Sequence, residues 1–267
     1  MFAPPFQLFG PAHIAAMVLM VVVAAAMTVA ARRSDSPRVT RGLCIGLALV
    51  LLVNQSVGWA YRYLAEGGEV FVREHLPLHV CGTTILLSAA MLLFRRRWTF
   101  ELVYFWGLAG ATNAMVTPEL SEGFPHYLFF QYFISHGAIV VAALFATFGL
   151  GMRPTFRSLV RAFVALNVMA VAVTPVNLLV DGNYMYLRAI PDTASPFIFL
   201  PWPWYLLKLE VLAAVFFGLL YLPVHLENRR RGRLDAGPGP GPVPRPPPGS
   251  APPPGSAPPP GPTDTKH

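Results

Sequence analysis

The chain has 267 residues, of which 54% are hydrophobic and only 12% charged, with a formal net charge of +7. A soluble domain normally carries about twice that charged share to cover its surface. The mean hydropathy of +0.51 and the long apolar runs predict an all-α polytopic membrane protein. They exclude a soluble enzyme and a fibrous protein, and two cysteines are too few for a disulfide scaffold.

Seven apolar stretches predict transmembrane helices, because about 20 residues cross a hydrocarbon layer of about 30 Å. They lie at 10–31, 41–63, 76–94, 101–117, 127–150, 157–180 and 203–224. The fourth is the shortest, and we expect it to be tilted or broken near Pro118. The first has no basic segment before it and is followed by Arg32 and Arg33, so we expect a membrane span and not a cleavable signal.

Basic residues indicate the orientation of the spans. Sixteen of the 20 lysines and arginines follow the first, third, fifth and seventh stretches, including those near the C-terminus. The four on the other side are Arg62, Arg73, Arg188 and Lys208. Because basic loops stay in the cytoplasm, we expect the N-terminus outside and the C-terminus inside. Most arginines flank apolar runs without interleaved aromatic residues, so we do not expect nucleic-acid binding.

The composition changes sharply near the C-terminus. We predict a seven-helix transmembrane domain over residues 1–230 and a disordered Pro/Gly-rich cytoplasmic tail over 231–267. The tail repeats Gly-Ser-Ala-Pro-Pro-Pro and has little apolar surface to bury. It is either inert or a proline-rich ligand for a cytoplasmic partner. The oligomeric state stays open.

Polar side chains gather in the outer halves of the predicted spans, whereas the inner halves are mostly Val, Leu, Ala and Phe. Such residues are costly in lipid and usually face the interior of a helix bundle. Helix ends and interfacial anchoring explain some of them, but not the asymmetry between the two sides. We therefore expect an outward-facing pocket. Its candidate substrate-binding residues are His13, His79, Asn113, Gln131, Asn177, Lys208 and Glu210.

Cys81 and His136 are the candidate catalytic pair. Pro77 suits the first turn of a helix that enters from outside, which would place Cys81 one turn further in, where the helix dipole favours a thiolate. His136 lies about nine residues inside its span, too deep for an interfacial anchor. A cysteine and a histidine base are the minimum for covalent acyl transfer, although upright helices would leave them about 6 Å apart in depth. A packing role for the thiol and an interhelical hydrogen bond for the imidazole are the structural alternatives.

Neither a metal site nor a soluble cofactor is expected. His75 and His79 are four residues apart, but no third ligand with suitable spacing follows. The chain also lacks a glycine-rich phosphate loop.

Several short motifs together resemble the YwaF-like family of bacterial integral membrane proteins. They are Phe9-Gly10-Pro11-Ala12-His13, Leu76-Pro77-Leu78-His79-Val80-Cys81, Tyr104-Phe105-Trp106-Gly107, Thr117-Pro118, Phe133-Ile134-Ser135-His136-Gly137, Asn183-Tyr184-Met185-Tyr186-Leu187 and Trp202-Pro203-Trp204-Tyr205. The resemblance implies a multi-pass protein of a bacterial plasma membrane.

That family is similar to a eukaryotic transmembrane acyltransferase that remodels ether phospholipids with one cysteine and one histidine. By similarity these two residues fall on Cys81 and His136. A more remote likeness, to membrane hydrolases of lipid esters that use a threonine and a histidine, keeps Thr83 and Thr84 as alternative nucleophiles.

Two functions from different classes follow. The first is a lipid acyltransferase or acyl hydrolase whose partners are membrane lipids, with Asn113, Gln131 and Asn177 as candidate oxyanion donors. The second is a small-molecule transporter or solute-binding membrane protein without covalent catalysis. The apolar inner halves and the absence of a clean inverted repeat count against the transporter. A scaffold that docks through its tail is a third interpretation.

Overall fold

The structure is a computed structural model that describes residues 4–34, 36–190 and 201–235. Contacts divide the chain into two units, Met1–Glu227 and Asn228–His267. Most of the predicted tail, from residue 236 onward, lies outside the described residues. The described part is mostly helical and contains an isolated bridge between Pro5 and Glu122 but no strand. This confirms the predicted all-α class.

Five helices in the described part are long and apolar enough to cross a membrane. They are α1 (Pro11–Arg33), α2 (Pro37–Glu66), α7 (Tyr127–Leu144) with its π-helical continuation η2 (Phe145–Gly149), α8 (Phe156–Val180) and α9 (Trp204–Asp235). A shorter apolar helix, α4 (Val80–Phe94), corresponds to the third predicted span.

The fourth predicted span is one helical stretch with an irregular middle. It consists of α5 (Arg97–Leu102), η1 (Val103–Ala111) and α6 (Thr112–Val116), which follow one another without a gap. The irregularity is the π-helical turn pattern of η1, a feature found often at functional sites. The helix ends two residues before Pro118, because a proline disfavours helical geometry in the residue before it.

The start of α4 differs from the prediction. Pro77 does not form the first turn, since the helix begins at Val80 with His79 as its extended N-cap residue. The Thr83 hydroxyl donates a hydrogen bond to the Pro77 carbonyl at 2.7 Å, which holds the preceding segment against the helix start. Cys81 is consequently the second residue of α4, nearer to the positive end of the helix dipole than predicted.

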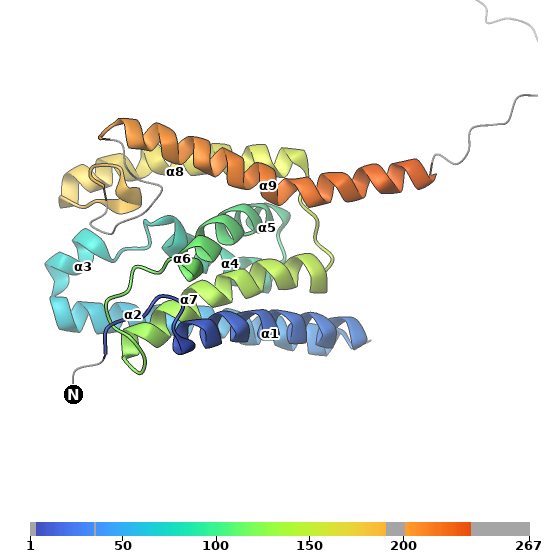
Figure 1. Cartoon of the computed structure of the whole chain (residues 1–267), viewed down its shortest axis with the longest axis horizontal. Coiled ribbons are helices and arrows are strands. Elements are labelled where there is room, and N and C mark those ends of the chain that lie inside the picture. Colours follow the sequence, from blue (N-terminus) through green and yellow to red (C-terminus); the bar gives the residue numbers. More distant parts are fainter. Residues whose placement is uncertain (1–3, 35, 191–200, 236–267) are drawn as a thin grey trace, which may run out of the picture. The chain divides into compact units, whose positions relative to one another are not determined.

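Helix α7 lies in the middle of the first unit (Figure 1). It packs against α1 and α2 on one side and against η1 on the other, and α4 packs against α2 and η1. Close approach requires glycine at Gly107, because a Cβ there would lie 2.8 Å from Cγ2 of Ile139. Small residues at such contacts let membrane helices approach closely.

The N-terminal ends of α5 and α8 are joined by a buried carboxylate. Glu101 accepts hydrogen bonds from the Ser158 hydroxyl at 2.8 Å, from Arg161 at 2.8 and 3.1 Å, and from Arg97 at 3.2 Å. Its side chain is 2% exposed, so these donors replace the water that the carboxylate loses. We call these four residues the Glu101 cluster.

Two short elements lie at the other end of the spans. Helix α3 (Gly68–Glu74) connects α2 to α4, and the 3₁₀ turn η3 (Tyr184–Tyr186) follows α8. Hydropathy did not predict either of them, because neither contains a long apolar run.

Candidate functional site

Titratable side chains from four segments lie near the N-terminal ends of α4 and α7, the ends that the arginine distribution predicts to face outward. We call this group the outer cluster, and it consists of Cys81, Glu119, Tyr132, His136 and Tyr186. Cys81 belongs to α4, Tyr132 and His136 belong to α7, and Tyr186 belongs to η3. Glu119 lies in the connection between α6 and α7.

Cys81 is a free, half-buried cysteine in the first turn of α4. The unsatisfied backbone N–H groups of that turn favour a negative charge and thereby a thiolate. On its other side the sulfur faces η1, since a Cβ built on Gly110 would lie 4.0 Å from it. Thr83 and Thr84 lie on the same helix, but their hydroxyls donate to the carbonyls of Pro77 and Val80 at 2.7 and 2.6 Å.

His136 is oriented by the backbone of its own helix. Its Nδ1 atom lies 3.0 Å from the Tyr132 carbonyl oxygen, and the two rings are 4.2 Å apart between centroids. A carbonyl oxygen can only accept a hydrogen bond, so Nδ1 must carry the hydrogen. In the neutral ring the Nε2 atom then has the lone pair. This is the tautomer that a general base needs.

Tyr132 packs against His136, and its own hydroxyl donates to the Ala114 carbonyl at 3.0 Å. A negative charge on Cys81 would act on the Tyr132 hydroxyl. The charge of Glu119 acts on both Cys81 and His136. Within the described residues no hydrogen bond joins the Cys81 thiol to the His136 ring. Catalytic hydrogen bonds are often long or misaligned before substrate binds, so the pair would have to close on binding.

Glu119 and Tyr186 cover the outer side of this cluster. The Tyr186 hydroxyl donates to a Glu119 carboxylate oxygen at 2.8 Å. Burial raises the pKa of Tyr186 and the nearby Glu119 charge raises it further, so the phenol stays protonated and remains a donor.

His79 connects η3 to the start of α4. Its Nδ1 atom accepts a hydrogen bond from the Met185 N–H at 3.3 Å. The His79 ring lies 5.2 Å from Tyr184 and 5.4 Å from Tyr186 between centroids. The residue therefore lies at the edge of the outer cluster, two positions before Cys81.

Asn177 of α8 holds η3 in place through hydrogen bonds to its backbone. It is fully buried, its Nδ2 donates to the Tyr184 carbonyl at 2.9 Å, and its Oδ1 accepts from the Tyr184 N–H at 2.7 Å. The Tyr184 hydroxyl in turn donates to the Val72 carbonyl at 2.7 Å. One asparagine thus holds the turn that carries Tyr186.

The other predicted binding residues lie in separate groups. His13 is buried, accepts from the Phe9 N–H at 2.9 Å and lies 2.7 Å from the Met115 carbonyl, so it joins α1 to α6. Gln131 donates to the Ser135 hydroxyl at 3.2 Å and forms a polar contact between α7 and α2 together with Asn54.

Asn113 is half-buried on α6, where its carbonyl accepts from Thr117 at 3.1 Å. Lys208 and Glu210 lie on α9. Glu210 accepts from Asn167 of α8 at 3.1 Å. The predicted polar residues are therefore divided among several helix contacts, and of the predicted binding residues His79 and Asn177 are the two connected to the outer cluster.

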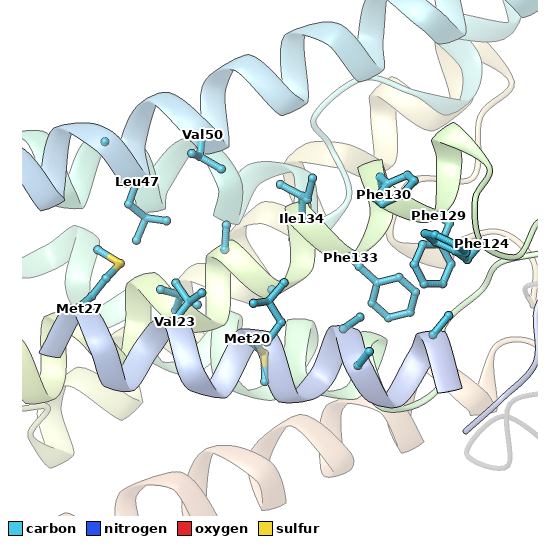
Figure 2. Close-up of a pocket in the computed structure, with 18 of the residues that line it drawn as sticks. Met20, Val23, Met27, Leu47, Val50, Phe124, Phe129, Phe130, Phe133 and Ile134 are labelled. Atoms are coloured by element: carbon cyan, nitrogen blue, oxygen red, sulfur yellow. The ribbon is translucent and has the colours of Figure 1, made fainter. Parts of the chain in front are cut away.

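A cavity of about 880 Å³ lies between α1, α2 and α7 (Figure 2). Its lining is apolar, with Phe129 and Phe133 towards one end and Met27 towards the other. None of the predicted site residues lines it. The outer cluster and this cavity are separate features, which share α7 but use different faces of it.

Sequence reasoning did not single out Glu119, Tyr132 and Tyr186 as site residues. Tyr186 lies within one of the family-like motifs, whereas Glu119 and Tyr132 lie in none of them. Their shared signal is position, because each lies within a few residues of an outer helix end. Among the described residues, no group of three or more His, Cys, Asp or Glu side chains has the geometry of a metal site.

The chain is similar in sequence to known proteins. An uncharacterized protein of Treponema pallidum (strain Nichols) is 24% identical over 162 residues, which cover 61% of this chain and 67% of the relative. No solved structure matches the chain. The sequence profile of the TMEM164 family matches residues 8–221, from just before α1 into α9. An all-helical membrane protein with this match over most of its length belongs to the TMEM164 family.

Proposed function

We propose that this protein is a lipid acyltransferase or lipid acyl hydrolase in a bacterial plasma membrane, with Cys81 as nucleophile and His136 as general base. The observation that carries the proposal is the hydrogen bond from His136 Nδ1 to the Tyr132 carbonyl. It leaves Nε2 as a proton acceptor in the same cluster as a free thiol at a helix N-terminus.

The reaction would proceed in two halves. His136 Nε2 takes the thiol proton as the Cys81 sulfur attacks the carbonyl carbon of a lipid ester. The carbon–oxygen bond breaks, an acyl-thioester forms on Cys81, and the departing alkoxide takes the proton from the imidazolium. The hydroxyl of a lysophospholipid or of water then gives its proton to His136 and attacks the thioester, and the thiolate leaves and is reprotonated.

The polar groups around the pair supply candidates for substrate binding. Two of the three amides proposed as oxyanion donors make hydrogen bonds that hold the fold, Gln131 to Ser135 and Asn177 to Tyr184. Asn113 is the remaining amide. His79, beside η3, is placed to contact a headgroup at the outer surface. The other proposed binding residues, His13, Lys208 and Glu210, contact different helices and would act on the site only through the fold.

The substrate class follows from the surroundings of the pair. Ester carbonyls of phospholipids lie just below the headgroups, and Cys81 lies at the outer end of its helix under the orientation predicted from the arginines. The resemblance to the YwaF-like family and to an ether-phospholipid acyltransferase supports the same chemistry. Thr83 and Thr84 are weaker nucleophile candidates, because their hydroxyls already donate to backbone carbonyls.

A lipid-like electrophilic probe tests the proposal directly. Wild-type protein in membranes should be labelled at Cys81, and His136→Ala should slow this labelling. Cys44→Ser is the matched control, because Cys44 is a buried free cysteine in the first turns of α2, towards the opposite end of the spans. The proposal fails if Cys81→Ser and His136→Ala leave both labelling and membrane lipid composition as in wild type.

One observation favours a transporter as the second candidate. Asn167, near the middle of α8, donates to the Glu210 carboxylate on α9, so a polar pair exists deeper than the outer helix ends. Solute uptake by proteoliposomes, compared between wild type and Glu210→Gln, tests this alternative. Uptake that persists in Cys81→Ser protein would favour it over the acyltransferase.

A further inference from the structure

The cavity between α1, α2 and α7 is long as well as apolar. On α1 its lining extends from Pro11 to Met27, which is about 24 Å along a helix axis and most of the hydrocarbon thickness. Its volume of about 880 Å³ falls within the range of small-molecule sites. We call this cavity the α1–α2–α7 groove.

Two glycines keep the α2 wall of the groove open. Gly42 and Gly46 are one turn apart and both line the groove. A Cβ built on either one would have no atom within 4 Å. The space in front of these glycines is therefore unoccupied by the protein itself.

The other walls carry apolar side chains of mixed size. Figure 2 shows Val23 and Met27 of α1 and Leu47 of α2 reaching into the space between these helices, and Phe133 of α7 doing so further along. Met20 and Met27 are flexible enough to adapt to an acyl chain.

Positive charge lies at the end of the groove marked by Met27 and Gly42. The segment 32–41 contains four arginines and one acid. Arg38 lies one turn before Gly42 on the same face of α2, is exposed, and forms no ion pair within the described residues. The positive-inside rule assigns this end to the cytoplasmic surface, where anionic headgroups gather.

We propose that the α1–α2–α7 groove binds an acyl chain of an anionic phospholipid from the cytoplasmic leaflet, with the phosphate at Arg38. This site is independent of the proposed acyl transfer, because neither Cys81 nor His136 lines the groove. The groove supplies the apolar contact and the arginine supplies the preference for a negative headgroup.

Lipid retained by purified full-length protein tests the groove. Wild type and the double variant Gly42→Leu/Gly46→Leu are purified in detergent, and co-purified phosphatidylglycerol is quantified by mass spectrometry. Because a Cβ at either position meets no atom within 4 Å, we expect the variant to fold normally and to lose most of the bound lipid. Gly218→Leu on α9 is the matched control, since its Cβ also meets nothing within 4 Å and it lies outside the groove. It should retain lipid as wild type does.

Headgroup preference tests the arginine. In nanodiscs of phosphatidylglycerol and phosphatidylcholine, Arg38→Gln should lower the preference for phosphatidylglycerol about fivefold, which is about 1 kcal/mol for one arginine at the membrane surface. Arg157→Gln, an exposed arginine at the start of α8 and outside the groove, should change it little.

Three outcomes would overturn the proposal. They are wild type that retains no lipid, equal retention in the groove variant and its control, and a change in oligomeric mass without a change in bound lipid. The last result would assign the groove to a second copy of this chain. Probe labelling of Cys81 should persist in all groove variants, so failure here is distinguishable from failure of the acyl-transfer proposal.

Discussion

The Glu101 cluster and the outer cluster both gather ionisable groups, but their hydrogen bonding differs. Glu101 receives four hydrogen bonds from Ser158, Arg161 and Arg97, so its acceptor capacity is well satisfied. In the outer cluster, His136 uses one ring nitrogen in a hydrogen bond to the Tyr132 carbonyl, and the nearby thiol of Cys81 is free. A satisfied cluster stabilises the fold, whereas unused acid–base capacity beside a nucleophile is what catalysis requires.

The largest expected effect is on chemistry in the outer cluster. Cys81→Ala should lower acyl transfer or hydrolysis by about 10³-fold or more, as does loss of a member of a nucleophile–base unit. The melting temperature should change little, because the side chain is small and only half-buried. Turnover of a phospholipid substrate and thermal unfolding in detergent measure the two effects. A large loss of stability with unchanged turnover would mean that Cys81 supports the fold and not the chemistry.

His136→Ala should lower the same activity by about 10²- to 10⁴-fold, the usual contribution of a general base. His136→Gln sharpens the comparison, since it retains polarity without the proton-accepting ring. If both variants kept full activity, His136 would be a packing residue that bonds to its own helix, and the role of Tyr132 would be structural.

Glu101→Gln should lower stability and leave the chemistry at Cys81 unchanged, the reverse of the effect expected for Cys81→Ala. It removes the charge that Arg161 and Arg97 surround, and we expect a loss of about 2 kcal/mol in unfolding free energy, typical of hydrogen bonds to charged groups. Labelling of Cys81 should be unchanged below the new melting temperature. Thermal unfolding with parallel labelling measures both, and slowed labelling at low temperature would mean that the two clusters are coupled.

Tyr186→Phe should have a smaller effect that distinguishes positioning from packing. The change deletes the hydroxyl that donates to Glu119 while keeping the ring beside His79. The rate of Cys81 labelling should change severalfold, with about 1 kcal/mol or less in stability. Tyr63→Phe, an exposed tyrosine on α2, is the control and should behave like wild type.

The smallest expected effect concerns pH and the segment that follows α8. A hydrogen bond from Arg188 to Asp181, helped by the charges of Arg188 and Arg73, lowers the pKa of Asp181 below its ordinary value of 3.8. Its contribution is therefore present above that ordinary pKa and is lost as the pH falls through the lowered one. Because both side chains are exposed, the contribution is slight.

Unfolding of wild type and Arg188→Gln between pH 7 and pH 3 measures this contribution. The difference between them should shrink as the pH falls. Part of it should remain at low pH, because Arg188 also donates to the carbonyls of Asn177 and Gly182. A difference that grows with acid would contradict the assignment.

Hydropathy predicted most of the fold because membrane insertion depends on local composition. The prediction failed at the beginning of α4, because Pro77 lies three residues before the helix and its carbonyl accepts a hydrogen bond from the Thr83 hydroxyl within the helix. Hydropathy also could not predict the π-helical turns of η1, because they depend on which backbone carbonyl accepts the hydrogen bond of each N–H. For the candidate site, the sequence predicted Cys81, His136 and His79 but did not single out Glu119, Tyr132 and Tyr186.

The sequence by itself determined the helical class, the approximate spans and the excess of arginine on one side, because each depends on the transfer of short segments between water and lipid. The tertiary structure decided which way each helix faces. That rotation joins His13 to Met115 and Glu210 to Asn167, and it leaves an apolar groove between α1, α2 and α7 that the sequence did not predict. Rotation about a helix axis is set by packing against neighbours that are distant in the chain, and no local pattern encodes it.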